Sequence, residues 1–411
     1  MAQIADTIIV GGGLAGGLCA LALGGEGLDV ALIDAEDPAR FRDETFDGRT
    51  TALAYAGARV FRRLGLWPAI ESEAEPILDI LVTDGRPAGP GRRSARSACH
   101  LHFDSRALKA EEPLGYIIEN RVLRAAIYDA IERSPRIALI APARAGDPDF
   151  AGGAARLSLD GGRRLEAPLI VAADGKTSPL RAAAGIRRHS WSYRQTAIVT
   201  TVAHERAHGG VAQELFLPSG PFAILPLTKN RSSIVWTERA AAAPAYLALD
   251  DAAFLAELAR RFGDYLGSLS LAGPRSGYPL GLHLAQSFMA PRLALIGDAA
   301  HAVHPIAGQG YNLGVKDIAA LADVLGDASR LGLDIGSLSV LEKYQRWRRF
   351  DSATLAFGTD ALNRLYSNDF GPLRLARDLG MGAVNAVSPL RKFFMRQAGA
   401  DLGRLPALMA P

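Results

Sequence analysis

The N-terminal part of the chain alternates short apolar runs with a glycine-rich turn and helix-forming residues. Residues 7–10 form a continuous apolar run rich in β-branched side chains, which is typical of a buried parallel strand. A glycine-rich turn over 11–17 and a helix-forming stretch over 18–23 follow, and a second apolar run over 30–33 stops at Asp34. This order predicts one βαβ unit at the start of the chain.

Further periodic segments extend the pattern. Helical periodicity returns over 52–64 and 122–132, and buried strands are predicted over 169–172 and 293–296. The stretch 85–98 is rich in Gly, Pro and Arg, which predicts an exposed loop. We assign the two later strands to the same α/β unit as the N-terminal strands.

The middle of the chain has a different pattern. From about 190 to 238 the sequence is β-rich and alternating, which indicates an antiparallel sheet, and from Gln309 onward it is mostly helical. The predicted fold class is α/β: a Rossmann-type nucleotide-binding domain interleaved with a β-rich substrate domain and followed by a helical C-terminal region. The expected bounds are 1–75, 105–186 and 275–345 for the first domain, 76–104 and 187–274 for the second, and 346–411 for the helical region.

Composition narrows the cellular context. The 411 residues carry a net charge of only +3, which does not argue for nucleic acid as a partner. Cys19 and Cys99 are the only cysteines, so a disulfide scaffold is excluded and a reducing cytoplasm fits best. The N-terminus shows no secretory signal and no run of about 18 apolar residues occurs, so we expect a cytoplasmic protein whose membrane contact is at most peripheral.

The glycine-rich turn is the first motif that carries chemistry. In Gly11-x-Gly13-x-x-Gly16 the first glycine makes the tight turn, the second lets the backbone approach a pyrophosphate, and the third lets the helix pack on the sheet. Asp34 can accept hydrogen bonds from ribose hydroxyls. The alternative is a glycine-rich turn without a ligand. However, the predicted strand, helix, second strand and acidic residue occur in the order that a dinucleotide site requires. We predict a dinucleotide site, which by itself does not distinguish FAD from NAD.

Two later motifs favour FAD. Residues 173–181 read Ala-Asp-Gly-Lys-Thr-Ser-Pro-Leu-Arg, and residues 297–312 contain Gly-Asp-Ala-Ala-His and Gly-Gln-Gly-Tyr-Asn. An Asp at a strand end can bind the hydroxyls of a ribityl chain, and a Gly-rich segment that opens a helix can direct backbone N–H groups at the flavin pyrimidine. Each motif alone is compatible with an ordinary turn, but coincidence of all three is improbable.

With these motifs the sequence resembles the single-component FAD-dependent aromatic hydroxylases and, within them, the ubiquinone-biosynthesis branch. The resemblance covers nearly the whole chain. Beyond the FAD motifs it rests on the segments 47–53, 119–123, 193–197, 208–216, 220–227, 278–280 and 389–396. The FAD motifs are specific for the superfamily, and the other segments are specific, though less strictly, for the branch.

The resemblance implies a chemistry that the cofactor carries. NADH or NADPH, bound transiently outside any second Rossmann fold, reduces FAD, and O2 adds to give a C4a-hydroperoxide whose distal oxygen is transferred to a phenol ring. The implied substrate is a polyprenyl phenol on the route to ubiquinone, and a quinone-biosynthesis complex would supply protein partners. No protein nucleophile, acid–base dyad or metal is required, and we expect no metal site.

The resemblance also assigns cofactor-binding residues by position. Arg49 and Arg121 match arginines that lie against FAD phosphates or ribityl, Asp174 would lie near the pyrophosphate, and Asp298 near the ribityl chain. Pro305 would border the isoalloxazine. The full set expected to bind the cofactor is Gly11, Gly13, Leu14, Ala15, Gly16, Asp34, Arg49, Arg121, Asp174, Gly297, Asp298, Pro305, Gly308, Gln309, Gly310 and Asn312.

No catalytic side chain is assigned, because the chemistry is borne by the flavin. The side chains expected to line the flavin are Pro305, Gln195 and His301. For His301, and for His304 beside it, a structural role is the stronger interpretation and proton transfer the alternative.

The C-terminal stretch 389–409 places apolar side chains such as Phe393 among the basic residues Arg391, Lys392 and Arg396. We hold two interpretations equal. One is a basic amphipathic helix that lies at a membrane surface or on a partner, and the other is a helix that packs on its own domain.

Three functions follow from these observations. The preferred one is hydroxylation of a polyprenyl phenol, for which we expect an apolar tunnel that opens at the surface. A hydroxylase of a small soluble phenol would instead have a closed pocket with an Arg for a carboxylate. A non-catalytic FAD-containing subunit of a biosynthetic complex would oxidise no NAD(P)H with any phenol.

Overall fold

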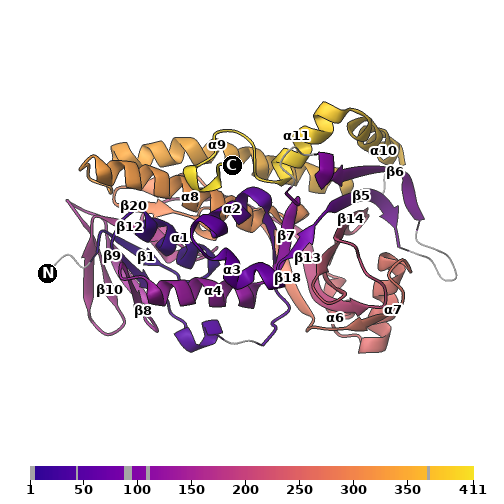
Figure 1. Ribbon diagram of the computed structural model, residues 1–411, viewed down its shortest axis with the longest axis horizontal. Helices are drawn as coiled ribbons and strands as arrows, with labels where there is room; N and C mark the ends of the chain where they lie inside the picture. The colour runs from indigo at the N-terminus through magenta and orange to yellow at the C-terminus, as the bar shows by residue number, and fades with distance from the viewer. Residues whose placement is uncertain (1–4, 43–44, 88–94, 108–111, 368–370) are drawn as a thin grey trace.

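The structure, a computed structural model, describes residues 5–42, 45–87, 95–107, 112–367 and 371–411. A parallel sheet with its helices forms one end of the molecule and a larger sheet forms the other, while two long helices run along one side (Figure 1). This arrangement confirms the predicted α/β fold class with a helical C-terminal region.

The parallel sheet contains the predicted βαβ unit. Its strand order is β19-β20-β12-β1-β2-β8, and all neighbouring pairs are parallel except β19 with β20. The strands are β1 (Thr7–Val10), β2 (Val30–Ile33), β8 (Ile137–Ile140), β12 (Leu169–Ala172), β19 (Met289–Ala290) and β20 (Leu293–Leu295). Helix α1 (Leu14–Gly25) contacts both α4 (Asn120–Arg133) and α8 (Gln309–Arg330). The apolar runs therefore became buried strands because these helices remove them from water.

A small antiparallel sheet corrects one prediction. The segment 52–64 was expected to be helical throughout, but residues 50–54 form β3 (Thr50–Ala54), and only α2 (Tyr55–Arg63) is helical. Strand β3 pairs with β7 (Gly115–Glu119), which also pairs with β4 (Glu75–Ile77). The hydrogen bonds of this ladder outweigh the local helical periodicity of residues 52–54. Helix α3 (Trp67–Ile70) follows α2.

The larger sheet holds most of the β-rich middle of the chain. Its order is β21-β18-β13-β16-β15-β14-β5-β6, with β17 paired to β13. Its strands are β5 (Asp79–Arg86), β6 (Ala95–Asp104), β13 (Arg188–His204), β14 (Val211–Leu217), β15 (Gly220–Leu227), β16 (Arg231–Arg239), β17 (Leu269–Leu271), β18 (Ser276–Ala285) and β21 (His301–Ala302). Helices α6 (Ala243–Leu247) and α7 (Asp251–Phe262) lie beside it (Figure 1). A separate three-stranded sheet is formed by β9 (Ala145–Asp149), β10 (Ala155–Leu159) and β11 (Arg164–Ala167).

The hairpin of β5 and β6 corrects a second prediction. The stretch 85–98 was expected to be an exposed loop, but Gly85 pairs with Arg96 and Arg86 with Ala95 in an antiparallel ladder. Residues 88–94 of this stretch lie outside the described residues. Strands β5 and β6 pair with each other both before and after Gly85. The hydrogen bonds of this ladder therefore outweigh the preference of the local Gly and Arg residues for a loop.

Of the three C-terminal helices, the last two lie at the end of the larger sheet, and the first runs along the side of the molecule (Figure 1). The three helices are α9 (Leu338–Tyr366), α10 (Gly371–Ala386) and α11 (Ser388–Ala398). Helix α10 packs on β6 and α11, and a buried ion pair of 2.8 Å joins Arg377 of α10 to Asp84 of β5. None of the described helices is long and apolar enough to cross a bilayer.

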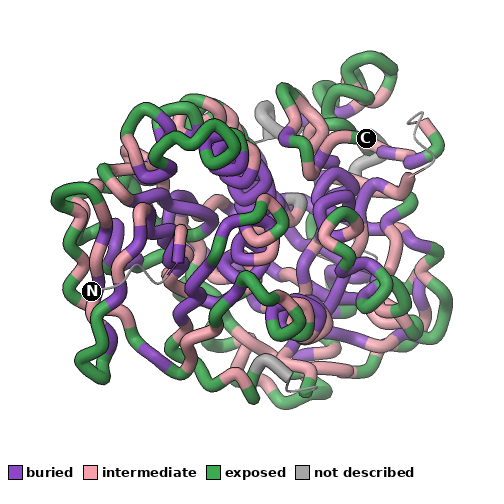
Figure 2. Tube along the Cα trace, turned by 60° about the vertical axis from the view of Figure 1, so that its left-hand side comes forward, coloured by how far each residue is buried: buried purple, intermediate pink, exposed green. Residues whose placement is uncertain are grey.

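Buried positions concentrate inside the molecule, and exposed ones lie along its outer turns (Figure 2). The largest apolar core joins the parallel sheet to α1, α2, α4 and α8, and a second core lies between the larger sheet and α7. Two cores of this kind are compatible with the expected division into a nucleotide-binding and a substrate domain. The domain bounds themselves remain a prediction.

Candidate functional site

The three sequence motifs meet at one edge of the parallel sheet. Val10 pairs with Ala172, and Ala172 pairs with Leu295, so the residues that follow these strands leave the sheet side by side. The backbone N–H of Ala173 donates to Val10 O at 2.8 Å, which holds the first two strand ends together. Ligands of α/β sheets bind outside such carboxyl ends.

The three glycines of the first motif have different surroundings. Gly11 has φ +101°, and a Cβ there would lie 2.3 Å from Ala173 O; a Cβ at Gly16 would lie 1.7 Å from Gly11 O. A Cβ at Gly13 would meet no atom within 4 Å, although Gly13 is the N-cap of α1. Internal packing therefore requires Gly11 and Gly16, while Gly13 faces open space beside the first N–H groups of α1, which at the start of a helix have no partner within the helix. This arrangement fits the close approach of a pyrophosphate.

Two side chains hold the glycine-rich turn. One oxygen of the Asp34 carboxylate accepts a hydrogen bond from Gly12 N, and the other accepts from Glu36 N at 2.7 Å. The Tyr128 hydroxyl donates to Gly12 O at 2.6 Å. The sequence analysis missed Tyr128, because nothing in the pattern of α4 shows that this residue faces a turn 116 positions away.

The second and third motifs contribute an acid each. Asp174 accepts a hydrogen bond from Leu180 N at 3.1 Å at the start of α5 (Pro179–Ala183), and burial raises the pKa of its carboxyl. The Asp298 side chain is exposed, yet the surrounding protein raises the pKa of its carboxyl by desolvation. A carboxyl enclosed by protein on most sides but open on one suits the wall of a cleft. A Cβ at Gly310 would meet no atom within 4 Å, so the start of α8 is open as well.

A buried charge network supports the third motif. Asp317 on α8 accepts from Arg348 Nε at 2.8 Å, from His301 Nε2 at 2.5 Å and from Gly297 N at 3.1 Å. Asp317 and Arg348 are fully buried. His301 therefore connects the Gly-Asp turn to α8, which favours a structural role for it. Pro305 caps the short turn 306–308 that leads into α8.

Gln195, the remaining side chain predicted to line the flavin, is also held by hydrogen bonds. The Gln195 amide donates to Ser219 O at 2.9 Å and accepts from Asn363 at 3.1 Å, which joins β13 to α9. His304 is fully buried, its ring packs edge-on against Tyr193, and burial lowers its pKa to about 4. Its ring is therefore neutral near pH 7, and both ring nitrogens are buried without a hydrogen-bond partner among the described residues.

The two predicted arginines lie near each other in the backbone, because Asn120 N donates to Arg49 O at 3.0 Å. The Arg49 guanidinium is about half exposed and pairs with Asp47 at 2.7 Å. Arg121 pairs with the buried carboxylate of Glu119 at 2.6 Å. Contact of either guanidinium with FAD remains a proposal.

The remaining predicted residues surround the starts of the two helices. Tyr311 OH donates to Leu14 O at 3.4 Å, and a Cβ at Gly297 would lie 3.4 Å from the Ala15 side chain, so the first and third motifs are in contact. Asn312 donates to Ala52 O at 2.8 Å and to Gly308 O at 3.0 Å, which joins α8 to β3. Gly308 has φ +63°, a conformation that favours glycine.

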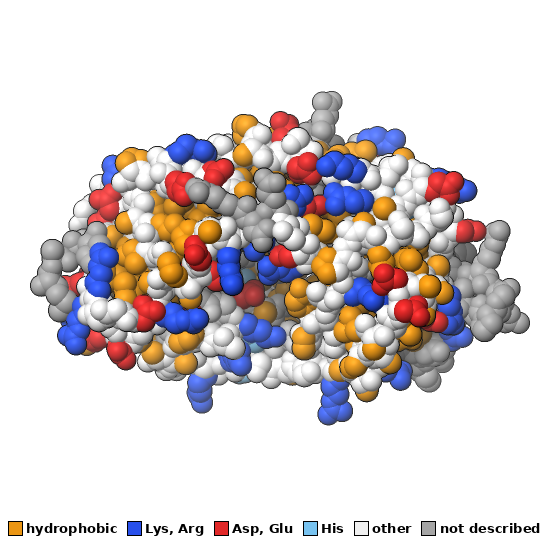
Figure 3. Space-filling view, turned by 90° about the horizontal axis from the view of Figure 1, so that it is seen from below, with side chains coloured by type: hydrophobic (Ala, Val, Ile, Leu, Met, Phe, Trp, Pro, Cys, Tyr) orange, Lys and Arg blue, Asp and Glu red, His pale blue; other side chains and the backbone are white. Residues whose placement is uncertain are grey.

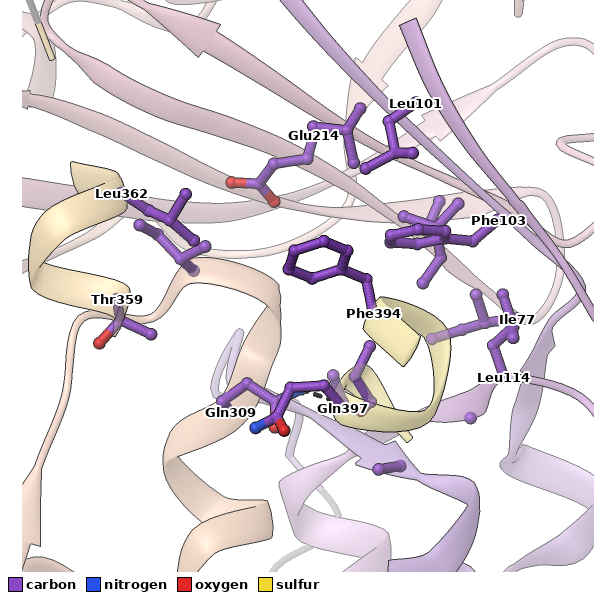
Figure 4. Close-up of a pocket in the computed structure, with 18 of the residues that line it drawn as sticks. Ile77, Leu101, Phe103, Leu114, Glu214, Gln309, Thr359, Leu362, Phe394 and Gln397 are labelled. Carbon is purple, nitrogen blue, oxygen red and sulfur yellow. Dashed lines mark hydrogen bonds between the residues drawn. The ribbon is translucent and has the colours of Figure 1, made fainter. Parts of the chain in front are cut away.

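An apolar cavity of about 320 Å³ adjoins the start of α8 (Figure 4). Ile306, Gln309 and Asn312 of the third motif line one side of it, and the opposite wall comes from β5, β6 and β14. Helices α9, α10 and α11 complete the enclosure. Among the described lining residues Glu214 carries the only carboxyl group. Glu214 was not among the residues predicted from the sequence, because the run Val211–Leu217 does not alternate strictly and so does not show which way its side chain points.

The surface opposite α9 has a second relevant feature. Figure 3 shows this face, where Lys and Arg side chains lie together with Asp and Glu side chains near the middle of the molecule. Charges of both signs therefore surround this part of the surface.

Comparisons with known proteins agree with this geometry. The family model described as "FAD binding domain" matches residues 4–350. A ubiquinone hydroxylase, UbiL, of Rhodospirillum rubrum is 48% identical over 97% of this chain and 90% of its own length. The 3-demethoxyubiquinol 3-hydroxylase of Escherichia coli is 34% identical over 96% of this chain and 98% of its own. Among solved structures, the p-nitrophenol 4-monooxygenase PnpA of Pseudomonas putida shares the fold with a TM-score of 0.79 at 19% identity, over 98% of this chain and 100% of its own.

The fold, the motif edge and these relatives define an FAD-dependent monooxygenase of the aromatic-hydroxylase class. Within that class the chain belongs to the family of ubiquinone-biosynthesis hydroxylases. The resemblance stated from the sequence is thereby confirmed, and FAD is the cofactor.

Proposed function

We propose that this protein uses FAD, NADH or NADPH, and O2 to hydroxylate the aromatic ring of a polyprenyl phenol in ubiquinone biosynthesis. The observation that carries the proposal is the apolar cavity beside the start of α8. It adjoins the motif assigned to the flavin, and its walls suit a ring with a hydrocarbon tail. The names of the two ubiquinone hydroxylases support the same substrate class.

The residues of the chain would bind, orient and exclude water. The open space at Gly13 and the N–H groups of α1 would take the pyrophosphate, with Asp34 near the ribose and Asp298 near the ribityl chain. The start of α8 at Gly308 and Gly310 would face the flavin ring. Bound FAD supplies the transfer of electrons to O2 and of one oxygen atom to the substrate. The apolar walls exclude water from that reaction.

The cavity favours a lipid over a small soluble phenol. A soluble aromatic acid would need a cationic partner for its carboxylate, and none of the described residues that line the cavity is Arg or Lys. Binding of a hydrocarbon tail against the apolar lining is instead favourable, by about 25 cal/mol for each Å² of apolar surface removed from water.

We also propose a peripheral membrane contact through the helices α9, α10 and α11. Large apolar side chains on them are exposed, for example Phe357, Leu379 and Phe393 at 60%, 63% and 51%. Arg391 and Lys392 lie beside Phe393 on α11, as in helices that rest on anionic lipid. Since these helices also enclose the cavity, a lipid substrate would have a short path into it.

Co-sedimentation with vesicles that contain anionic lipid tests the membrane contact. Phe393→Ser should lower the bound fraction several-fold. Leu331→Ser, at a side chain that is 72% exposed just after α8, should leave it unchanged and serves as the control. Equal binding by both variants and the wild type would contradict the contact.

The enzymatic proposal is tested on the purified holoenzyme under air. We would follow the oxidation of NADH and of NADPH with and without a short-chain prenylphenol, and analyse the product by mass spectrometry under ¹⁸O2. A product that gains one labelled oxygen supports the hydroxylase. Oxidation with the prenylphenol unchanged but a soluble phenolic acid hydroxylated would favour the soluble substrate. No reduction of the bound flavin by either nucleotide would favour the non-catalytic subunit.

A further inference from the structure

Glu214 occupies an unusual place in the wall of the apolar cavity. It lies on β14, where its partners in the ladder are Ala223 on β15 and Val82 on β5. Phe216, two residues along the same strand, also lines the cavity. Figure 4 shows the Glu214 side chain directed into the cavity, with its carboxyl oxygens near Phe394. A carboxyl at an inward position of an apolar wall is costly unless something binds to it.

The other polar side chains of the cavity are largely bound to the protein itself. The Asn312 amide joins β3 to α8, and the Thr359 hydroxyl donates to Leu355 O at 3.0 Å within α9. Gln309 donates to Ala398 O at 3.0 Å. The Glu214 carboxyl, in contrast, makes no hydrogen bond or ion pair with any residue that the structure describes. It is thus a polar group aimed into the space that a ligand would fill.

The chemistry of this carboxyl suits a hydroxyl partner. Burial alone raises the pKa of the Glu214 carboxyl to about 8, so it is mostly neutral near pH 7. The other titratable side chain among the described lining residues is that of Tyr366. A neutral carboxyl can donate one hydrogen bond and accept others, and therefore binds a neutral hydroxyl without requiring a charge on the ligand.

We propose that the Glu214 carboxyl hydrogen-bonds a ring hydroxyl of the aromatic substrate, and thereby selects and orients a hydroxylated ring in the cavity. The inference rests on the proposed function, because it concerns the substrate of the same site. A ring without a hydroxyl would leave the carboxyl unpaired in an apolar cavity, and sites built around a hydrogen bond reject such analogues. Glu214 is in this role a specificity-determining residue.

The test compares the binding of two ligands to the holoenzyme by equilibrium dialysis. One is a short-chain prenylphenol, and the other is the same prenylated ring without the hydroxyl. Glu214→Met keeps the length of the side chain but removes the hydrogen bond, and should lower the preference for the phenol about tenfold. Glu214→Gln should retain the preference, because an amide also donates and accepts hydrogen bonds. Thr359→Val is the matched control and should keep the wild-type ratio of the two dissociation constants, since its hydroxyl is already bonded within α9.

The outcomes separate this inference from the proposed function. If both ligands bind and Glu214→Met leaves their ratio unchanged, the inference is wrong while the substrate class stands. Gln397 is a polar lining residue drawn on the other side of the cavity in Figure 4. If Gln397→Met, and not Glu214→Met, removes the difference between the two dissociation constants, the Gln397 amide binds the hydroxyl and the inference is wrong. If the wild type binds neither ligand, the proposed substrate class itself is wrong.

Discussion

Asp317→Asn tests whether the buried charge network holds the candidate flavin site together. Asp317 and Arg348 are fully buried, and the Arg348 Nε–Asp317 Oδ1 distance is 2.8 Å. Loss of the carboxylate charge leaves the buried Arg348 guanidinium paired with Asp351, whose carboxylate lies 3.0 Å away and is partly exposed. In addition, an amide nitrogen must face one of the donors that now surround the carboxylate. Removing one partner of a buried pair costs about 3–5 kcal/mol. We expect a loss of unfolding free energy of that size, together with weaker FAD binding because Gly297 N loses its acceptor.

The assay is chemical denaturation of wild type and variant, followed by circular dichroism, with FAD affinity measured separately. Asp327→Asn is the matched control on the same helix, because Asp327 is exposed and pairs with the exposed Arg330 at 2.7 Å. Exposed pairs contribute less than about 1 kcal/mol. If Asp317→Asn costs no more than Asp327→Asn, the network does not support the site in the way we describe.

The pH dependence gives the Asp317 prediction a second readout. Burial acts to raise the pKa of the Asp317 carboxyl, but the positive charges of His301 and Arg348 outweigh it and hold the pKa below its usual value of 3.8. At a pH above 3.8 the carboxyl is therefore charged in both the folded and the unfolded protein, and its full contribution to stability is present. The contribution is lost as the pH falls through the lower folded-state pKa. The difference between wild type and Asp317→Asn should shrink in that acidic range.

Two further predictions follow from the same structure. Gly13→Val should abolish FAD binding while the melting temperature of the apoprotein stays near wild type, since the added side chain meets open space; Gly16→Ala should lower that melting temperature, because its Cβ would lie 1.7 Å from Gly11 O. A Gly13→Val protein that purifies with full flavin would refute the assignment of that glycine. Glu214→Gln should be more stable than wild type by about 2–4 kcal/mol at pH 8, and no more stable at pH 4. The reason is that burial raises the folded-state pKa of the carboxyl to about 8, so the wild type loses stability as the pH rises from 4.5 to about 8. Identical pH profiles of unfolding for the two proteins would show that the carboxyl is not desolvated.

Sequence reasoning identified the three motifs because their signals are local. The buried strands at 7–10 and 169–172 could be read from apolar runs, and the turns that follow them from glycine and aspartate. The convergence of the motifs at one edge depends on the strand order, in which β1, β12 and β20 are neighbours, and only the structure shows that order. Local pattern was misleading where a ladder decided the structure, as at residues 52–54 and at Gly85.

What the sequence determined by itself was the fold class, the family and the three motifs assigned to FAD. Only the tertiary structure decided which side chains support those motifs, because such contacts join positions far apart in the chain. Tyr128 reaches Gly12 across 116 positions, and Asp317 reaches Arg348 across 31. The same holds for Glu214: its strand could be predicted, but whether its side chain faces solvent, another sheet or an apolar cavity depends on how α9, α10 and α11 pack over that strand.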